Sequence, residues 1–542
     1  SLKLKNSYLN MLKELPKSIE SRSGQLLVKL GIIKKHGKGI YFFTPFGLHL
    51  LNNVKAKVKE KLVKENFAEI DIPIINLKNN FNEKGYFESK DIDGKSYLTR
   101  GTDLYLYEDY LKNIINSYKD LPVEFFYINK KAINDNKANE ELLNPMSTEI
   151  YKSFSVLSKE QYQERVRNYK EISLEIIEDF GISPINIKKH KESQGIIYGW
   201  LSKKGNEKTA YCPKCKKYHD VNYMEVSACT TEDEEVKELK KLKTPNIKTI
   251  EDLQEFTKTD IKKLIKAVLL KVVDKNYVVF IRGDRELSKS KLVRLIKSDE
   301  NLIKQASEED LEDMGTTGGF VGPIGLKNCQ IIVDEEVKHI KNGIAGANEI
   351  DYHIENINYS RDFEDVICGD IVIATDMDKC IECNTNLEIH NYYRIGELKD
   401  NNEIYYDEAD IKYIDNTGKE NSIYKIENSL DLYKIISVSL EEKEDNLLKL
   451  LPWDINILLL KTDDEDSVVL GEKIYNILKN NSRKPLLDDR NMKVGNKFKE
   501  GELLNINEKI IIGRRAKEGI VEYQNNEDDK KIEITLEEID KL

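Results

Sequence analysis

The chain has 542 residues, enough for three or four domains, and its 39% hydrophobic and 33% charged residues are ordinary for a soluble globular protein. A formal net charge of −11 argues against a protein that coats nucleic acid without sequence preference, because phosphate binding needs positive charge. It leaves open RNA recognition by local basic patches. The sequence contains no long apolar run and no signal-peptide pattern, so we expect no association with a membrane.

The first 180 residues alternate between helical and extended patterns. Leu51, Val54 and Val58 recur at helical spacing, which predicts an amphipathic helix over 47–66. Strands are predicted over 68–75, which contains Pro73, and over 123–129, which is rich in Phe and Tyr. The charged segment 160–180 predicts a further helix.

The middle of the chain predicts a compact α/β unit over about 245–375. Residues 232–265 are rich in Lys and Glu and indicate helices and a linker. Two apolar strands over 267–273 and 277–281 follow, then a charged helix, a Gly-rich loop at 315–325 and two more short strands.

The last part of the chain, after residue 450, predicts a small α/β domain. Its predicted strands cover 455–460, 485–489, 508–513 and 520–523, with helices at 467–480 and 536–542.

Seven cysteines are present, and four of them form two CxxC pairs, Cys212 with Cys215 and Cys380 with Cys383. An odd total and this spacing favour reduced thiols and metal binding over disulfides, and therefore a cytoplasmic location. Four thiolates in two such pairs suit a tetrahedral structural zinc site, which would clamp the two strands that lead into and out of an inserted domain. Reduced thiols without metal remain the alternative.

The order of several segments resembles bacterial-type prolyl-tRNA synthetases from about residue 15 to the end. The matching stretches are SRSGQLLVKLGIIKKHGKGIYFFTPFGLHLL, RGDRELS, GGFVGPIGL, GANEIDYHIENINYSRDF, LLDDR, VGNKF and IIIGRRAKEGIVE. The resemblance implies an α+β and α/β multidomain fold: a class II synthetase core with an antiparallel sheet, an inserted α/β editing-like domain and a C-terminal α/β anticodon-binding-like domain. The implied segments are the core over 1–211 and 380–450, a CxxC neck and linker over 212–240, the insertion over 241–379 and the last domain over 451–542.

The segments that activate the amino acid in this family depart from its pattern. In GTDLY, Thr102 is kept but Leu104 replaces a glutamate; in FFYINKKAIND, Ile133 replaces an arginine and Asp135 a glutamate. In SIYKIENSL, Lys425 and Glu427 replace glycines and Leu430 an arginine.

Activation brings a carboxylate to the α-phosphate of ATP, and arginines neutralise the charge that develops there. Isoleucine and leucine cannot neutralise this charge. We therefore expect that proline activation is lost and that ATP with Mg²⁺ is not used. Alternatively, these differences only reflect a chain that is rich in lysine and has few arginines.

The inserted domain keeps the family's editing residues by resemblance. They are Lys266, Asp334, His353 and the loop positions Gly319 and Pro323. A Gly-rich loop can present backbone N–H groups to an oxyanion, a lysine can hold the terminal phosphate of a tRNA, and a small pocket can admit alanine but exclude proline. Alternatively, the loop is only a turn and the histidine is structural.

Basic residues of the last domain are candidates for tRNA contact: Arg490, Lys497, Arg514 and Arg515. Solvated loop charge is the alternative for each. By resemblance the partner is tRNA, specifically tRNA(Pro), with no DNA, and the chain is a homodimer with Pro73 at its interface.

Three functions stay open. The first is a synthetase-like protein that binds tRNA and hydrolyses mischarged Ala-tRNA(Pro). The second is a non-catalytic regulator that binds an amino acid, tRNA or a protein on a repurposed scaffold. The third is a diverged but active prolyl-tRNA synthetase.

Overall fold

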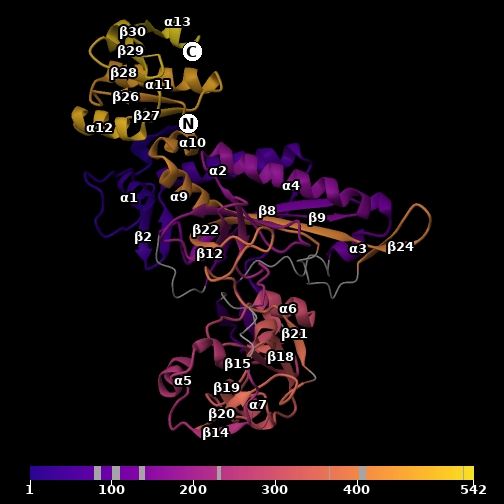
Figure 1. Ribbon diagram of the computed structural model, residues 1–542. Helices are drawn as coiled ribbons and strands as arrows, with labels where there is room; N and C mark the ends of the chain where they lie inside the picture. The colour runs from indigo at the N-terminus through magenta and orange to yellow at the C-terminus, as the bar shows by residue number, and fades with distance from the viewer. Residues whose placement is uncertain are drawn as a thin grey trace. The chain divides into compact units, whose positions relative to one another are not determined.

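The computed structural model describes residues 1–77, 87–99, 110–133, 141–228, 234–298, 300–364, 366–401, 411–528 and 530–542. The chain forms two compact units, of which the first comprises residues 1–76, 85–184 and 412–542, and the second residues 77–84 and 185–411 (Figure 1). Apart from 77–84, the second unit is one continuous stretch of sequence that interrupts the first.

Four strands of the first unit are hydrogen-bonded neighbours in the order β25-β9-β8-β4. Their bounds are Tyr424–Asp431, Ser147–Leu157, Val123–Ala132 and Ala68–Glu69. The pairs β25–β9 and β9–β8 are antiparallel, and β4 runs parallel to β8. Helices α2 (Pro45–Lys64) and α4 (Lys159–Asp179) pack against each other.

The first turn of α2 explains where this helix begins. The Thr44 side chain accepts a hydrogen bond from the Gly47 N–H, and Pro45 occupies the first helical position, where a missing N–H costs nothing. Val54, Val58 and Leu62 are fully buried along one face. The predicted helices at 47–66 and 160–180 are therefore confirmed within two residues at each end.

The predicted strand over 68–75 is wrong beyond its first two residues, because β4 ends at Glu69. Ile70 still donates its N–H to the Phe126 carbonyl at 2.9 Å, but Pro73 has no N–H to offer a continuing ladder.

The first unit also contains several smaller elements. They are β2 (Ile33–Gly37), β3 (Ile40–Phe43), β5 (Asn76–Leu77), β6 (Glu88–Lys90), β7 (Ser96–Leu98), β23 (Lys412–Ile414) and β24 (Glu420–Ser422), with helices α1 (Arg22–Lys29), α3 (Lys112–Ile114), α9 (Leu432–Glu442) and α10 (Leu447–Leu450).

The last 90 residues and the N-terminal strand β1 together build a six-stranded sheet in the order β1-β27-β26-β28-β29-β30. The strands are β1 (Leu2–Lys3), β27 (Pro485–Asp488), β26 (Ile455–Leu459), β28 (Glu508–Ile512), β29 (Ile520–Asn525) and β30 (Lys530–Thr535). The sheet is parallel from β1 to β28 and antiparallel from β28 onward. Helices α11 (Glu465–Asn480), α12 (Val494–Leu504) and α13 (Leu536–Ile539) accompany it, so the predicted terminal helix ends early.

In the second unit, a five-stranded sheet has the order β17-β15-β16-β18-β21 and a three-stranded sheet the order β14-β20-β19. The strands are β15 (Ile265–Val272), β16 (Lys275–Arg282), β17 (Ile303–Gln305), β18 (Gln330–Asp334), β21 (Ile367–Gly369), β14 (Lys240–Lys243), β19 (Gly343–Gly346) and β20 (Tyr352–Ile357). Helices α5 (Ile250–Thr257), α6 (Lys289–Ile296), α7 (Glu308–Asp313) and α8 (Glu335–Lys338) connect them. The expectation of only helices and linker over 232–265 is wrong at β14, which pairs with β20.

Five more strands of this unit are hydrogen-bonded in the order β11-β10-β13-β12-β22, and β11 also pairs antiparallel with β22. Its strands are β10 (Ile185–Lys188), β11 (Ile196–Leu201), β12 (Glu207–Cys212), β13 (Lys217–Asp220) and β22 (Glu388–Lys399). Strands β12 and β22, which flank the inserted α/β part in sequence, pair antiparallel.

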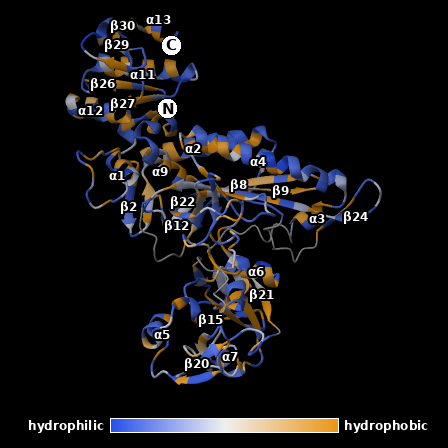
Figure 2. Cartoon of the chain, viewed as in Figure 1, coloured by the Kyte–Doolittle hydropathy of each residue, from blue (hydrophilic) through white to orange (hydrophobic). Residues whose placement is uncertain are grey.

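Hydrophobic side chains concentrate on strands such as β26 and β27, whereas α4 is largely hydrophilic (Figure 2). Ile455, Ile457 and Leu487 of these strands are at most 1% exposed. Within the described parts of the chain, no helix is both long enough and apolar enough to cross a membrane.

Candidate functional site

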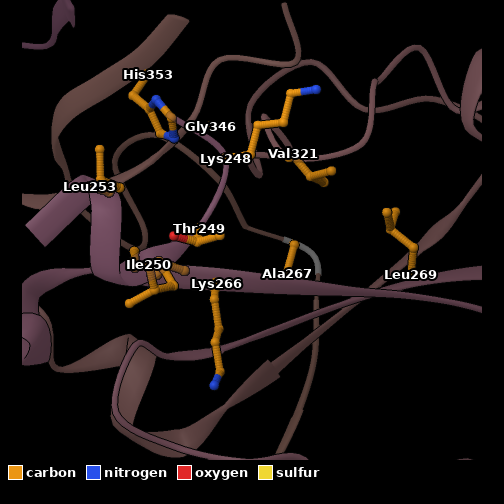
Figure 3. Close-up of a pocket in the computed structure, with 12 residues that line it drawn as sticks. Lys248, Thr249, Ile250, Leu253, Lys266, Ala267, Leu269, Val321, Gly346 and His353 are labelled. Atoms are coloured by element: carbon orange, nitrogen blue, oxygen red, sulfur yellow. The ribbon is translucent and has the colours of Figure 1, made fainter. Parts of the chain in front are cut away.

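A cavity of about 120 Å³ lies in the inserted α/β part, between β15, the segment 319–321 and strands β19 and β20 (Figure 3). It is lined by Lys248, Thr249, Ile250, Leu253, Ile265, Lys266, Ala267, Leu269, Gly319, Val321, Gly346 and His353. Three of the residues predicted from sequence, Lys266, Gly319 and His353, therefore meet here. Asp334 and Pro323 are buried and do not line the cavity.

The imidazole of His353 is held in one orientation. Its Nδ1 atom is 2.6 Å from the hydroxyl of Thr244, and its ring meets that of Phe320 edge-on at 5.6 Å. Burial lowers the pKa of His353 to about 4, so the ring is neutral near pH 7. A neutral, fixed imidazole can form hydrogen bonds to a ligand but offers it no positive charge.

Glycines let the loop and the neighbouring strand approach closely. A Cβ atom on Gly322 would lie 1.7 Å from the Gly346 carbonyl oxygen, and one on Gly346 would lie 2.1 Å from Phe320 backbone. Asn348 fixes the same loop, since its Oδ1 accepts from the Gly322 N–H at 2.9 Å and its Nδ2 donates to the carbonyls of Gly322 and Ile324. The loop is thus a rigid wall of the cavity.

Lys266 borders the cavity but directs its ammonium group elsewhere. Its Nζ donates to Glu286 Oε1 at 3.1 Å. Figure 3 shows the side chain extending from β15 away from His353, whereas the neighbouring Ala267 extends from the opposite side of the strand. This alternation is the ordinary pleat of a strand.

Asp334 serves the backbone. Its Oδ1 accepts from the Glu336 N–H and its Oδ2 from the Ile371 N–H, each at 3.0 Å. Burial raises the pKa of Asp334 to about 6, with the nearby charges of Glu336 and Asp370 acting in the same direction. The carboxylate caps α8 and ties β18 to the segment after β21.

Sequence reasoning missed Thr244, Lys248 and Thr249, which precede or begin α5. Thr249 accepts from the Asp252 N–H at 3.1 Å and so caps the helix. The spacing of Thr249 and Asp252 ahead of an apolar helix was the available signal for the cap, but nothing in the pattern pointed to a cavity.

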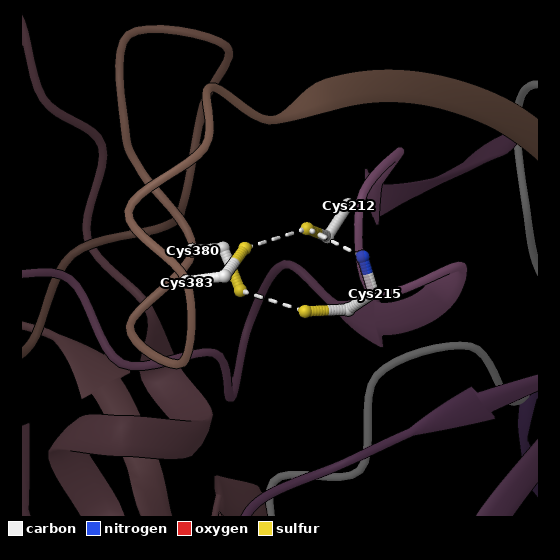
Figure 4. A group of neighbouring side chains, drawn as sticks. All are labelled: Cys212, Cys215, Cys380 and Cys383. Atoms are coloured by element: carbon white, nitrogen blue, oxygen red, sulfur yellow. Dashed lines mark hydrogen bonds between the residues drawn. The ribbon is translucent and has the colours of Figure 1, made fainter.

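The four cysteines of the two CxxC pairs come together in the second unit (Figure 4). The sulfur atoms of Cys212 and Cys383 are 3.4 Å apart, those of Cys215 and Cys380 are 3.9 Å apart, and all four lie within 4.8 Å of one another. Zn–S bonds of about 2.3 Å in a tetrahedron place sulfurs about 3.8 Å apart, so this donor set fits zinc.

Both cysteine turns have the same backbone form. The residue after the second cysteine takes a left-handed conformation in each, Lys216 at φ 55° and Asn384 at φ 58°. The Cys215 N–H also donates to the Cys212 sulfur at 3.4 Å. Each turn therefore points both of its thiols to the same side.

A buried arginine links the second turn to the inserted part. Arg285, 1% exposed, bonds both carboxylate oxygens of Glu336 and both of Asp378 at 2.7–2.9 Å. Asp378 lies two residues before Cys380. The guanidinium of Arg285 therefore links helix α8 to the segment that leads into the second cysteine turn.

The predicted activation positions are described in part: Thr102, Leu104 and Asp135 lie outside the described residues. Ile133 follows β8 and donates its N–H to the Met146 carbonyl at 2.8 Å. Leu430 on β25 is fully buried. Glu427, 6% exposed, forms an ion pair of 2.9 Å with Lys152 on the adjacent strand.

The four basic residues of the last domain have different surroundings. Arg490 is paired with Asp488 and Glu500, and Lys497 is fully buried, its Nζ donating to the Leu459 carbonyl at 2.6 Å. These two hold the domain together.

Arg515 is exposed and forms ion pairs with Glu518 and Glu533. Arg514 is exposed and forms no ion pair with any residue that the structure describes. These two side chains are the ones open to a ligand.

Comparison with known proteins identifies two parts of the chain. Residues 244–363 match the model of the aminoacyl-tRNA editing domain, and residues 454–542 match that of the anticodon binding domain.

The chain is similar over its length to two proteins named proline–tRNA ligase. That of a Sulfurihydrogenibium species is 30% identical over 548 residues, with 96% of this chain and 95% of the relative covered. That of Finegoldia magna is 30% identical over 572 residues, with 99% and 96% covered. A crystal structure of prolyl-tRNA synthetase from Cryptosporidium parvum with L-proline and AMP aligns at a TM-score of 0.52 and 10% identity, covering 99% of this chain and 77% of that one; this likeness concerns the fold alone.

Proposed function

The chain belongs to the proline–tRNA ligase family, and from this premise we propose that it binds tRNA(Pro) and hydrolyses mischarged alanyl-tRNA in its inserted domain, without activating proline. The observation that carries the proposal is the contrast between the two sites. The inserted domain keeps a shaped cavity with a fixed, neutral histidine, whereas buried side chains and an internal ion pair occupy the motif positions that serve activation in the family.

The cavity suits a small aminoacyl group. Ala267, Leu269 and Val321 supply apolar wall, and a volume of about 120 Å³ leaves room for little more than a short side chain. His353 can accept or donate one hydrogen bond to the ester or to the attacking water or ribose hydroxyl, because its ring stays uncharged. No serine or cysteine nucleophile is needed for such a hydrolysis.

The loop carrying Gly319 and Pro323 contributes shape. Its Gly322 N–H is already bonded to Asn348, so a donor to the oxyanion has to come from another part of the loop or from water. Lys266 has to leave Glu286, which is 79% exposed and therefore a weak partner, to reach a ligand. Asp334 supports the site through the backbone.

Loss of proline activation is supported by the side chains on β25 at the positions that serve activation in the family. Glu427 adds a side chain and a charge at a position where the resemblance places a glycine, and that charge is neutralised by Lys152 from within the protein. Leu430, in place of an arginine, offers no hydrogen bond to a phosphate.

Four thiolates from Cys212, Cys215, Cys380 and Cys383 would hold a structural zinc ion, which would fix the two turns to each other and leave no coordination position for a substrate. Of the four basic residues predicted to contact tRNA, Arg514 and Arg515 are the two that are exposed. A homodimer and a cytoplasmic location belong to the same proposal.

Retained proline activation is the second candidate, and the similarity of the whole chain to proline–tRNA ligases favours it. Two assays on the purified protein separate the candidates. Release of alanine from Ala-tRNA(Pro), with Pro-tRNA(Pro) as the control substrate, tests the hydrolase, and we expect alanine release that falls at least tenfold in a His353→Ala variant. Proline-dependent exchange of pyrophosphate into ATP tests activation, and robust exchange would refute the loss that we propose.

A further inference from the structure

Two lysines border the cavity of the inserted domain, and their ammonium groups have different surroundings. Lys266 is bonded to Glu286 and its side chain extends to the far side of β15 from Lys248 (Figure 3). Lys248 is exposed and forms no ion pair or hydrogen bond through its side chain with any residue that the structure describes. Lys248 is therefore the cation that a ligand can reach at this rim without displacing a protein partner.

Gly319 makes the position of Lys248 specific. A Cβ atom on Gly319 would lie 2.9 Å from both Cβ and Cγ of Lys248 and 3.3 Å from its Cδ. The stem of the lysine thus lies directly on the Gly-rich loop, in a space that only a glycine leaves open. Gly319 also has a φ of +88°, a conformation that a side chain would strain.

The backbone on both sides of Lys248 is fixed. Thr249 caps α5 through the Asp252 N–H. On the other side, the Asn246 N–H donates to Asp351 Oδ1 at 2.8 Å and the Thr244 N–H to the Asp351 carbonyl at 2.7 Å. The stem therefore starts from a rigid base, while its last atoms stay free to follow a ligand.

We infer that Lys248 binds a backbone phosphate of the RNA strand whose 3′-aminoacyl end enters the cavity. This rests on the proposed function, because it takes aminoacyl-RNA as the ligand. The terminal nucleotide of an RNA carries a phosphate on the 5′ oxygen of the same ribose that is esterified. A lysine ammonium is a mobile point charge suited to such a group. His353, neutral and buried, supplies no charge for that phosphate.

The two lysines therefore have different roles in RNA binding. Lys248 contributes affinity that depends on salt, because one phosphate contact on single-stranded RNA adds about 0.7 to the slope of log affinity against log salt concentration. Lys266 contributes little to ground-state binding. A charge-assisted hydrogen bond of this kind corresponds to a loss of about tenfold or more in affinity when it is removed.

The test uses the full chain and an acceptor-stem RNA hairpin of tRNA(Pro) that carries alanine through a stable 3′-amide bond, so that binding is measured without hydrolysis. Dissociation constants are determined by fluorescence anisotropy between 50 and about 200 mM salt. We expect Lys248→Ala to weaken binding about tenfold or more and to lower the salt slope by about 0.7, Lys248→Arg to restore most of the affinity, and Lys266→Ala to stay within about twofold. Lys243→Ala is the matched control, since Lys243 is an exposed lysine on β14 that does not line the cavity.

Kinetics with Ala-tRNA(Pro) add a second readout, in which Lys248→Ala raises KM more than it lowers kcat. A wild-type protein that binds the hairpin through Lys248 but releases no alanine would refute the proposed hydrolase and leave the phosphate contact standing. The inference itself is overturned if Lys248→Ala binds like wild type, if only Lys266→Ala loses affinity, or if wild type does not bind the hairpin at all.

Discussion

The carboxylate of Glu427 on β25 lies 2.9 Å from the ammonium of Lys152 on the adjacent strand β9, with 8% and 17% of the two side chains exposed. In such a pair, each charge compensates the desolvation cost of burying the other. Removal of one partner takes away a charge that compensates the burial of the other.

Replacing Lys152 by Met is therefore expected to destabilise the protein by about 2–3 kcal/mol, towards the lower end of what removal of one partner of a buried pair costs, because Lys152 keeps some exposure. The double variant Lys152→Met with Glu427→Met is expected to regain most of that loss, since no unpaired charge remains. Urea unfolding followed by circular dichroism measures both. A double variant no more stable than Lys152→Met would mean that the two side chains do not form a stabilising ion pair between β25 and β9.

The cysteine cluster predicts a metal-dependent stability. Cys383→Ser, or removal of the metal by a strong chelator, is expected to cost about 3 kcal/mol and to lower the melting temperature of the second unit by about 6–12 °C. Metal analysis of the untreated protein is expected to give one zinc per chain.

A matched control is available in Cys329→Ser, because Cys329 is a half-buried cysteine outside the cluster. Equal melting of chelated and untreated protein, together with no bound metal, would favour the alternative of reduced thiols.

The fold class was predictable from sequence because the motifs occur in a fixed order along the whole chain, and this prediction is confirmed by the two matched domain models and the shared fold. Long amphipathic helices such as α2 and α4 were also predictable, since their apolar spacing is sustained over many residues. The short strands β26, β27 and β28 were predicted within one residue at each end. The helix between β27 and β28 was not predicted. Helix α12 contains Gly495 and Gly501, which lower helical propensity, yet the tertiary structure around Lys497 holds it.

The site was predictable only for residues with a matching motif. Gly319 and His353, named from their motifs, both line one cavity in the structure. The direction of the Lys266 side chain depends on the pleat of β15, which the motif does not give. Lys248 escaped notice because an exposed lysine in a Lys-rich segment carries no signal of its own. Its relation to Gly319 exists only in three dimensions.

Burial of His353 predicts a pH dependence of stability. Its pKa is lowered to about 4 from an ordinary value of about 6.5, so between these values the unfolded chain binds one proton more than the folded protein. Stability attributable to His353 therefore falls as pH falls through this window. In His353→Gln, the slope of unfolding free energy against pH is expected to be smaller by up to about 1.4 kcal/mol per pH unit.

The comparison has to be made between variant and wild type, because other groups titrate in the same range. Burial also lowers the pKa of His190 to about 4, which acts in the same sense, and raises that of Asp334 to about 6, which acts in the opposite sense. Urea unfolding at several pH values between about 4.5 and 6.5 measures the difference. Parallel curves would show that the folded protein protonates His353 as readily as the unfolded chain does.

Two glycines of the same loop region separate backbone strain from the contact with Lys248. Gly319 and Gly315 have φ values of 88° and 71°, so an alanine at either position suffers the same kind of strain, about 1–2 kcal/mol. A Cβ on Gly315 would meet nothing within 4 Å, whereas one on Gly319 would press on the stem of Lys248 at 2.9 Å. Both variants are thus expected to lose similar stability, but only Gly319→Ala is expected to bind the amide-linked hairpin more weakly, about as weakly as Lys248→Ala. Equal affinities of the two glycine variants would mean that the position of the Lys248 stem has no influence on RNA binding.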